Sequence, residues 1–297
     1  MRKILVVAMF SAGTFCSNAQ SLTEFNALAQ KKDTIAQQDM LKKWEKSGNN
    51  DPDFYVAAFN YHFFSARKEV LQLGTAPAGE ESLVLQDNEG NDAGYLGSSV
   101  IYNDAEVKKA IRYIDKGIAK FPDRLDLRFG KVFLLGETKN YAPFTKDIVA
   151  VVNHSAKIKN KWMWKEGKPL EDPKDFMLSS IQDYVLTLYN TGDDALLNNM
   201  LEIATAVLKH YPDHVESLSN ASIVHMIQDE PKKAVELLLR AEKLAPKDTI
   251  VLGNIAQAYV MSDDKANALK YYELVIAYGN DESKAFAQDQ IEKNKLK

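Results

Sequence analysis

The chain has 297 residues, of which 45% are hydrophobic and 26% are charged, and its formal net charge is −4 at pH 7. This usage is typical of a globular protein and excludes an intrinsically disordered chain. The acidic balance and the absence of a long basic run argue against a nucleic-acid partner.

The N-terminus reads MRKILVVAMFSAGTFCSNAQ, in which a basic start is followed by an apolar core over residues 4–15. Ser17 and Ala19 place small side chains at the third and first positions before a cut at Gln20. This pattern predicts a secretory signal peptide over residues 1–19, because the apolar core is too short to span a bilayer of about 30 Å. We therefore expect export to the periplasm of a Gram-negative bacterium.

Cys16 is the single cysteine of the chain and raises the alternative of an outer-membrane lipoprotein anchored through this residue. Phe15 stands where lipoprotein signals carry Gly, Ala or Ser, so the lipid anchor is the less favoured interpretation. Cleavage after Ala19 would leave no cysteine for a disulfide or a thiolate metal site. Since no later apolar segment is long enough to span a bilayer, we expect no transmembrane segment in the mature chain.

Residues 20–67 are expected to form N-terminal helical repeats. The stretch TIAQQDMLKKWEKSGNNDPDFYVAAFNYHFF indicates a helix, a turn and a second helix. Asp51 is suited to cap the second helix, and Pro52 is suited to its first turn, where the missing N–H needs no partner.

The helical pattern breaks over residues 68–103, where we predict a β-hairpin insertion. Leu83–Gln86 and Tyr95–Tyr102 are rich in strand-forming residues, and an Asn/Gly/Asp-rich turn separates them. A structureless loop of this length would be unusual in a compact protein. The turn QDNEGND lacks the glutamate that closes a calcium-binding loop, because Ser98 stands there, so we expect no metal.

Residues 104–158 are expected to form degenerate helical repeats, since apolar and small residues recur at helical spacing on both sides of Pro122. Residues 159–173 are expected to form a second loop or hairpin. Trp162 and Trp164 there have the period-two spacing of a strand and stand before the turn KEGK.

Residues 174–297 contain the clearest internal repeat. Pro212 and Pro246 are 34 positions apart, and Val215–Asp248 aligns with Thr249–Glu282 without a gap. Each unit has two apolar blocks at helical spacing, which predicts a pair of antiparallel helices. Because proline ends helices, both prolines are expected in turns between consecutive pairs. The polar C-terminal stretch from residue 281 is expected to be a capping helix.

This repeat resembles the tetratricopeptide repeat (TPR), whose period is 34 residues. Small residues stand at the positions where that family has them, namely Ser222, Ala234 and Ala241 in one unit and Ala256 and Ala268 in the next. Pro246 also matches, whereas His225 and Val275 depart from the family pattern. The resemblance implies an all-α, right-handed TPR-like α-α superhelix of helix pairs, to which one or two β-hairpin insertions are added.

In TPR arrays the first helices of the pairs line a concave groove that binds partner segments. The resemblance assigns this groove to Glu216, Ser219, Asn220, Ile223, Met226 and Ile227 in one unit and to Ile250, Asn254, Gln257 and Met261 in the next. The two asparagines are suited to hold a peptide backbone, since an amide both donates and accepts, or to join neighbouring repeats. The lack of Lys and Arg disfavours a clamp for a C-terminal carboxylate, and the isoleucines and methionines indicate an apolar lining.

Trp162 and Trp164 have three interpretations. As an exposed pair they would stack on a sugar ring or anchor a partner protein, and as a buried cluster they would cover the side of the array. Because tryptophan is mostly buried on average, packing is the favoured interpretation.

No H-E-x-x-H, G-x-S-x-G or phosphate-binding glycine loop occurs in the sequence, so we expect neither an enzyme nor a cofactor. The expected function is protein–protein interaction, in which the groove holds a segment of a partner protein or peptide. The alternative is a carbohydrate-binding accessory protein of an outer-membrane uptake system that uses Trp162 and Trp164. An enzyme whose site is assembled from distant residues is a third possibility.

Overall fold

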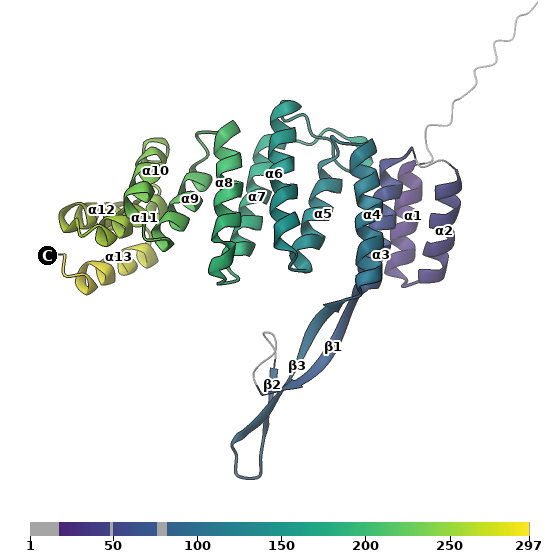
Figure 1. Ribbon diagram of the computed structural model, residues 1–297, viewed down its shortest axis with the longest axis horizontal. Helices are drawn as coiled ribbons and strands as arrows, with labels where there is room; N and C mark the ends of the chain where they lie inside the picture. The colour runs from purple at the N-terminus through teal and green to yellow at the C-terminus, as the bar shows by residue number, and fades with distance from the viewer. Residues whose placement is uncertain (1–17, 48–49, 76–81, 297) are drawn as a thin grey trace, which may run out of the picture. The chain divides into compact units, whose positions relative to one another are not determined.

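The computed structural model describes residues 18–47, 50–75 and 82–296 (Figure 1). Within these ranges the chain forms the helices α1–α13, two short 3-10 helices and one three-stranded sheet. Two compact units are present, Met1–Lys131 with Met163–Pro169 and Val132–Trp162 with Leu170–Lys297. Most of the expected signal peptide, including Cys16, lies outside the described residues, and α1 begins at Asn18.

The first unit begins with α1 (Asn18–Gln30), α2 (Thr34–Lys46) and α3 (Pro52–Ala66). The prediction for the start of α3 is confirmed, because Asp51 Oδ1 accepts the amide of Asp53 at 3.0 Å and Pro52 opens the helix. Asp51 Oδ2 also accepts the indole N–H of Trp44 at 3.1 Å, which links α2 to the start of α3.

Helices α3 and α4 (Asp104–Lys120) form a helix pair, although a long segment separates them in the sequence. Their close approach depends on Gly117, where an added Cβ would lie only 2.8 Å from the Cβ of Tyr55. The turn after α4 leads into α5 (Leu125–Glu137), which begins in this unit. There the buried Arg124 donates to Asp53 Oδ1 at 2.9 Å and to Asp126 Oδ2 at 2.7 Å.

The segment between α3 and α4 is an antiparallel sheet with the strand order β1-β3-β2. Its strands are β1 (Arg67–Gly74), β2 (Ser82–Gln86) and β3 (Asp92–Tyr102). The predicted hairpin corresponds to β2 and β3, but the prediction missed β1, whose sequence RKEVLQLG lacks a strict alternation of apolar and polar residues. The sheet leaves the helices at the end of α3 and returns at the start of α4 (Figure 1).

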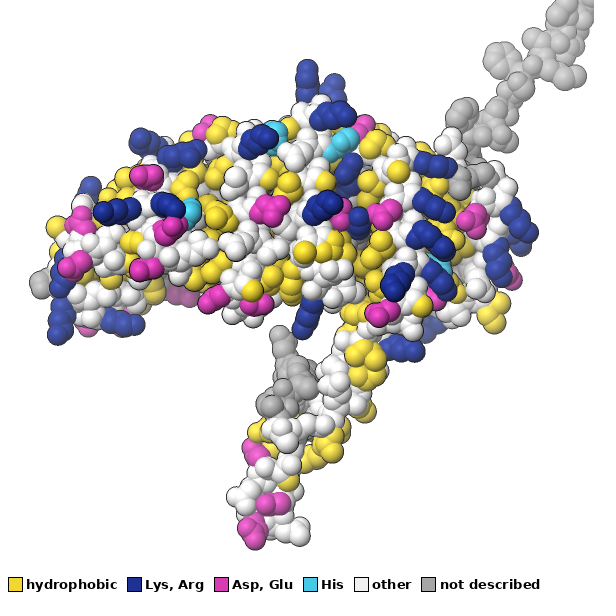
Figure 2. Space-filling view, in the orientation of Figure 1, with side chains coloured by type: hydrophobic (Ala, Val, Ile, Leu, Met, Phe, Trp, Pro, Cys, Tyr) yellow, Lys and Arg dark blue, Asp and Glu magenta, His cyan; other side chains and the backbone are white. Residues whose placement is uncertain are grey.

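The sheet exposes apolar side chains that no described helix covers. Leu73, Leu96 and Leu83 stand opposite one another in the strand register and therefore share one face. Leu73 is 71% exposed and Leu83 is 69% exposed. Figure 2 shows hydrophobic side chains along the sheet and acidic ones at its far end.

The second unit continues from the end of α5 with further helices. From the second of them onward each helix packs against the next in the sequence, whereas the first packs against the third. These helices are α6 (Tyr141–Lys157), α7 (Pro173–Tyr189), α8 (Leu197–His210), α9 (Val215–Ile227), α10 (Pro231–Leu244), α11 (Thr249–Met261), α12 (Lys265–Tyr278) and α13 (Asp281–Lys293). The turns expected at Pro212 and Pro246 lie between α8 and α9 and between α10 and α11. Ala234, Ala241 and Ala268 are fully buried, as expected where backbones approach closely.

The C-terminal helix α13 packs against α12 and buries Ala287 and Ile291. Apart from Ala285 and Phe286, which are exposed, the rest of its surface is polar, so it closes the end of the apolar core in the way predicted for a capping helix.

The expectation of a second loop or hairpin within residues 159–173 is met by a loop in which Met163 and Pro169 form an isolated antiparallel bridge across the turn. This stretch contains isolated bridges at Met163 and the 3-10 helix η1 (Lys165–Gly167). Trp162 does not lie on a strand but is only 1% exposed, and its indole N–H donates to Ser155 Oγ at 2.8 Å. Trp162 is therefore packed in the interior, as the favoured interpretation expected, and a residue only seven positions earlier accepts its indole hydrogen bond.

Across the part of the chain that the structure describes, none of the helices has both the length and the apolar character required to cross a membrane.

Candidate functional site

A cavity of about 250 Å³ opens along α7, α9 and α11, the first helices of three successive pairs in the second unit. Its apolar lining consists of Val185, Leu186, Tyr189, Met200, Val215, Ile223, Ile250 and Val251. Its polar lining consists of Gln182, Glu216, Ser219, Asn220, Asp248 and Asn254. We call this cavity the groove cavity.

The helices that line the groove cavity pack into the protein core through the faces that point away from the cavity. In α11, Val251, Leu252 and Ile255 are buried in the core, whereas Ile250 is 71% exposed. Asp248 caps the same helix, since its Oδ1 accepts the amides of Ile250 and Val251 at 2.9 and 3.2 Å. The start of α11 is thus fixed, and an apolar side chain is presented at the cavity without a partner in the core.

Amide side chains stand at equivalent positions of the three helices. Asn220 Nδ2 in α9 donates to Gln182 Oε1 in α7 at 2.6 Å, and Gln182 Nε2 donates back to Asn220 Oδ1 at 3.4 Å. This pair confirms that Asn220 joins neighbouring repeats. Asn254 in α11 occupies the next equivalent position, but its Nδ2 is buried and has no hydrogen-bond partner among the described residues.

Six of the residues predicted for the groove line this one cavity, namely Glu216, Ser219, Asn220, Ile223, Ile250 and Asn254. Ile227, Gln257 and Met261 do not line it, and Gln257 instead accepts the hydroxyl hydrogen bond of Tyr272 at 3.2 Å. Met226 does not line the cavity either, and it belongs to the same core cluster as the buried residues of α11.

Four lining residues of α7 were missed, namely Gln182, Val185, Leu186 and Tyr189. Gln182 and Asn220 are 38 positions apart, whereas Asn220 and Asn254 are separated by the regular 34. The turn after α7 is longer and contains the 3-10 helix η2 (Asp194–Leu196), so the 34-residue register does not reach α7. Aligning the ends of the first helices rather than the prolines would have found these residues.

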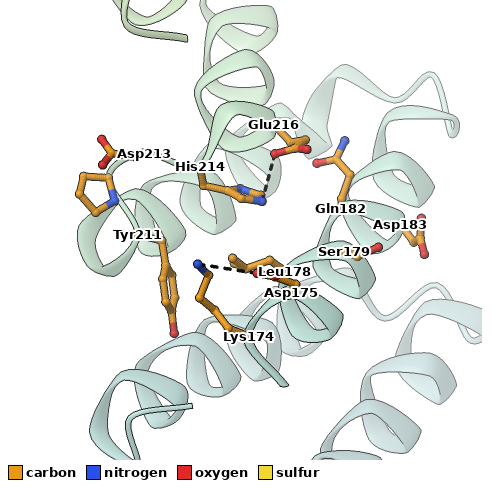
Figure 3. A pocket seen from close by; sticks show the side chains of 11 residues that line it. Lys174, Asp175, Leu178, Ser179, Gln182, Asp183, Tyr211, Asp213, His214 and Glu216 are labelled. Carbon is orange, nitrogen blue, oxygen red and sulfur yellow. Dashed lines mark ion pairs between the residues drawn. The ribbon is translucent and has the colours of Figure 1, made fainter. Parts of the chain in front are cut away.

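A second cavity of about 550 Å³ adjoins the groove cavity, with which it shares Gln182 and Glu216 (Figure 3). It lies between the first half of α7 and the turn that leads into α9, and we call it the acidic cavity. Its lining consists of Lys174, Asp175, Leu178, Ser179, Gln182, Asp183, Tyr211, Pro212, Asp213, His214 and Glu216. One lysine thus faces four carboxylates.

His214 forms the inner wall of the acidic cavity. Its Nδ1 lies 2.9 Å from Ser217 Oγ, and its Nε2 lies 3.2 Å from Glu216 Oε2 (Figure 3). Burial lowers the pKa of His214 below the ordinary 6.5, and Lys174 acts in the same direction, against the opposing effect of Glu216 and Asp175. The imidazole is therefore neutral at pH 7, and the cavity has a net negative charge.

The exposed tryptophan pair that a sugar site requires does not exist, because Trp162 is buried. Its ring packs against His154 with a centroid distance of 5.3 Å. The carbohydrate alternative thereby loses the feature on which it rested. Within the described residues no group of three or more His, Cys, Asp and Glu side chains is placed to hold a metal ion.

No family model matches the sequence, and no curated protein matches it. Several solved structures are similar in fold. The C-terminal part of a TPR repeat-containing protein from Cytophaga hutchinsonii has 13% identity and a TM-score of 0.45, with 92% of this chain and 83% of that chain covered. A tetratricopeptide repeat protein from Parabacteroides merdae has 11% identity and a TM-score of 0.36, with coverages of 89% and 80%.

A third structure is YrrB, described as a TPR protein with an unusual peptide-binding site, with 14% identity and a TM-score of 0.37 over 80% of this chain and 90% of that chain. These likenesses are distant, so the assignment of the fold rests on the chain itself. Antiparallel helix pairs at a 34-residue spacing, with buried small residues and proline-containing turns, define an all-α TPR-like protein with a β-sheet insertion.

Proposed function

We propose that this chain is a protein-interaction scaffold that holds an extended segment of a partner protein in the groove cavity and performs no chemistry itself. The observation that carries the proposal is the apolar cavity along three successive first helices, with amide side chains at the equivalent positions 182, 220 and 254. Concave apolar sites with a few polar groups are the usual form of ligand sites in proteins.

The groove cavity would contact both the side chains and the backbone of the bound segment. Leu186 and Ile250 are 48% and 71% exposed and would be covered by an apolar side chain of the partner. Asn254 lines the cavity, and its Nδ2 has no acceptor among the described residues, so after a change of side-chain rotamer it would donate to a backbone carbonyl of the partner. The apolar side chain supplies affinity, and the amide fixes the position of the segment.

Selection of phage-displayed random dodecapeptides on the purified chain tests this proposal. The affinity of each selected peptide for wild type and for the variant Leu186→Lys/Ile250→Lys is then measured by fluorescence anisotropy. Losing an apolar contact of about 1.5–3 kcal/mol should weaken binding by about tenfold or more. Leu244→Lys is the matched control, since Leu244 is 44% exposed on α10 and lines neither cavity.

The proposal fails if no peptide is selected, or if the double variant binds the selected peptides as tightly as the control does. Circular dichroism of each variant shows that a lost affinity does not come from unfolding.

Export to the periplasm is part of the same proposal and is supported by the signal-peptide pattern before Gln20. Cell fractionation followed by N-terminal sequencing tests it, with a periplasmic chain that starts at Gln20 as the expected result. A cytoplasmic chain would overturn the export proposal, whereas a lipid on Cys16 would replace the soluble form with an anchored one.

A further inference from the structure

We infer that the partner segment carries a basic side chain next to an apolar one, so that a lysine or arginine enters the acidic cavity while its apolar neighbour fills the groove cavity. This inference rests on the proposed function, because it specifies which segment the groove holds. It is carried by the position and charge of the two adjoining cavities.

The two cavities lie side by side on the same pair of helices. Gln182 of α7 and Glu216 of α9 line both of them, so a segment bound in one borders the other. In an extended segment, side chains on the same face are two residues apart and separated by roughly 6.5–7 Å. One short stretch of partner chain therefore occupies both cavities with closely spaced side chains.

The charge of the acidic cavity determines which side chain fits it. Asp183 and Asp213 form no ion pair with the described residues, and the ion-pair contact of Glu216 among these residues is to the neutral His214. Lys174 lies 3.7 Å from Asp175, so its charge is partly offset within the cavity (Figure 3). Arg240 donates to the Pro212 carbonyl at 3.1 Å from outside the lining. The unpaired charge in the cavity is negative, and it favours a cation.

Asn254 is an independent sign that the site takes a ligand. Its Nδ2 has no hydrogen-bond acceptor among the described residues. The side-chain amides of Gln182 and Asn220, by contrast, form hydrogen bonds to each other. A buried donor without a partner is costly, and a peptide carbonyl that meets the rearranged Asn254 side chain would remove this cost. A free C-terminal carboxylate or an acidic side chain would instead face the four carboxylates of the adjoining cavity.

The peptides selected in the preceding experiment test the inference directly. We expect most of them to contain Lys or Arg within three residues of a large apolar residue. One such peptide is then synthesised with its basic residue and again with norleucine in that place, which keeps the aliphatic chain and removes the charge. Both forms are titrated against wild type and Asp183→Asn/Glu216→Gln at low and high salt.

The double variant should bind the basic peptide about fivefold more weakly than wild type does at low salt, with a smaller difference at high salt. For the norleucine peptide, the difference in affinity between the double variant and wild type should be smaller and should not depend on salt. Glu236→Gln/Glu273→Gln is the matched control, because it removes the same charge from exposed positions of α10 and α12 that line neither cavity.

Two results separate this inference from the proposed function. If selected peptides lack basic residues, or if the Asp183/Glu216 variant binds them unchanged while Leu186→Lys/Ile250→Lys does not bind, the charge inference fails and the groove function stands. If Leu186→Lys/Ile250→Lys binds like wild type, the groove function fails and the inference fails with it.

Discussion

The backbone amide of Asn103 donates to the carbonyl oxygen of Ala66 at 2.9 Å. This hydrogen bond joins the last residue of α3 to the N-cap of α4, so the two ends of the β insertion meet. The ring of Tyr102 also stacks on Phe63, with a centroid distance of 5.9 Å and an interplanar angle of 6°. The insertion is therefore an addition to the turn of one helix pair and does not separate its helices.

We predict that α3 and α4 pair without the insertion. Replacing residues 68–101 by Asn-Gly leaves Arg67 and Tyr102 joined by a two-residue hairpin turn, for which Asn-Gly is the favoured sequence. Helical content and the urea midpoint should stay close to wild type, because shortening a loop changes its closure entropy only slowly with length. Circular dichroism during urea titration checks this, and loss of cooperative unfolding would show that the sheet is required.

Local signals allowed much of the fold to be predicted from the sequence. Pro212 and Pro246 mark turns because proline cannot continue a helix, and Ala268 is buried where two backbones approach. The missed features depend on packing between repeats. Met226 does not line the groove cavity and belongs to the core cluster instead. The residues of α7 that line the groove cavity were missed because the turn after α7 is longer than the turns between the later pairs. The 34-residue register therefore does not extend to this helix.

Ala268→Leu should destabilise the protein by about 1–3 kcal/mol, because the added side chain overpacks the contact of the helix pair. Ala268 has no exposed surface, and it lies in the core cluster between α11 and α12. Ala266→Leu on the exposed face of the same helix is the control, which should change stability by no more than about 0.5 kcal/mol. Urea denaturation compares them, and equal midpoints would contradict the assigned repeat register.

Ser155→Ala should destabilise the second unit by about 1–3 kcal/mol, because it leaves the buried indole N–H of Trp162 without its acceptor. Ser155 itself is fully buried, and its hydroxyl donates to Asn160 Oδ1 at 2.9 Å. Ser180→Ala, which removes a serine hydroxyl bonded within α7, is the control. The denaturation midpoint measures the cost, and tryptophan emission reports whether water reaches the indole. A Ser155 variant as stable as the control would show that packing alone holds Trp162.

Stability should fall as the pH is lowered through the range in which histidine titrates, because His214 is half-buried in its neutral form. Burial lowers its pKa from 6.5, so below this pH the unfolded chain binds a proton that the folded chain resists. The contribution of His214 is therefore complete above pH 6.5 and is lost as the pH falls towards the lowered pKa of the folded state.

Urea denaturation between about pH 7.5 and pH 5.5 measures this dependence while the carboxylates stay charged. His214→Gln should flatten the pH dependence, since the group that titrates is removed. Glu216→Gln should steepen it, because Glu216 raises the pKa of His214 and its removal makes protonation in the folded state harder still. If both variants follow the wild-type curve, protonation of His214 does not control stability, and the neutral imidazole in the acidic cavity would have to be reconsidered.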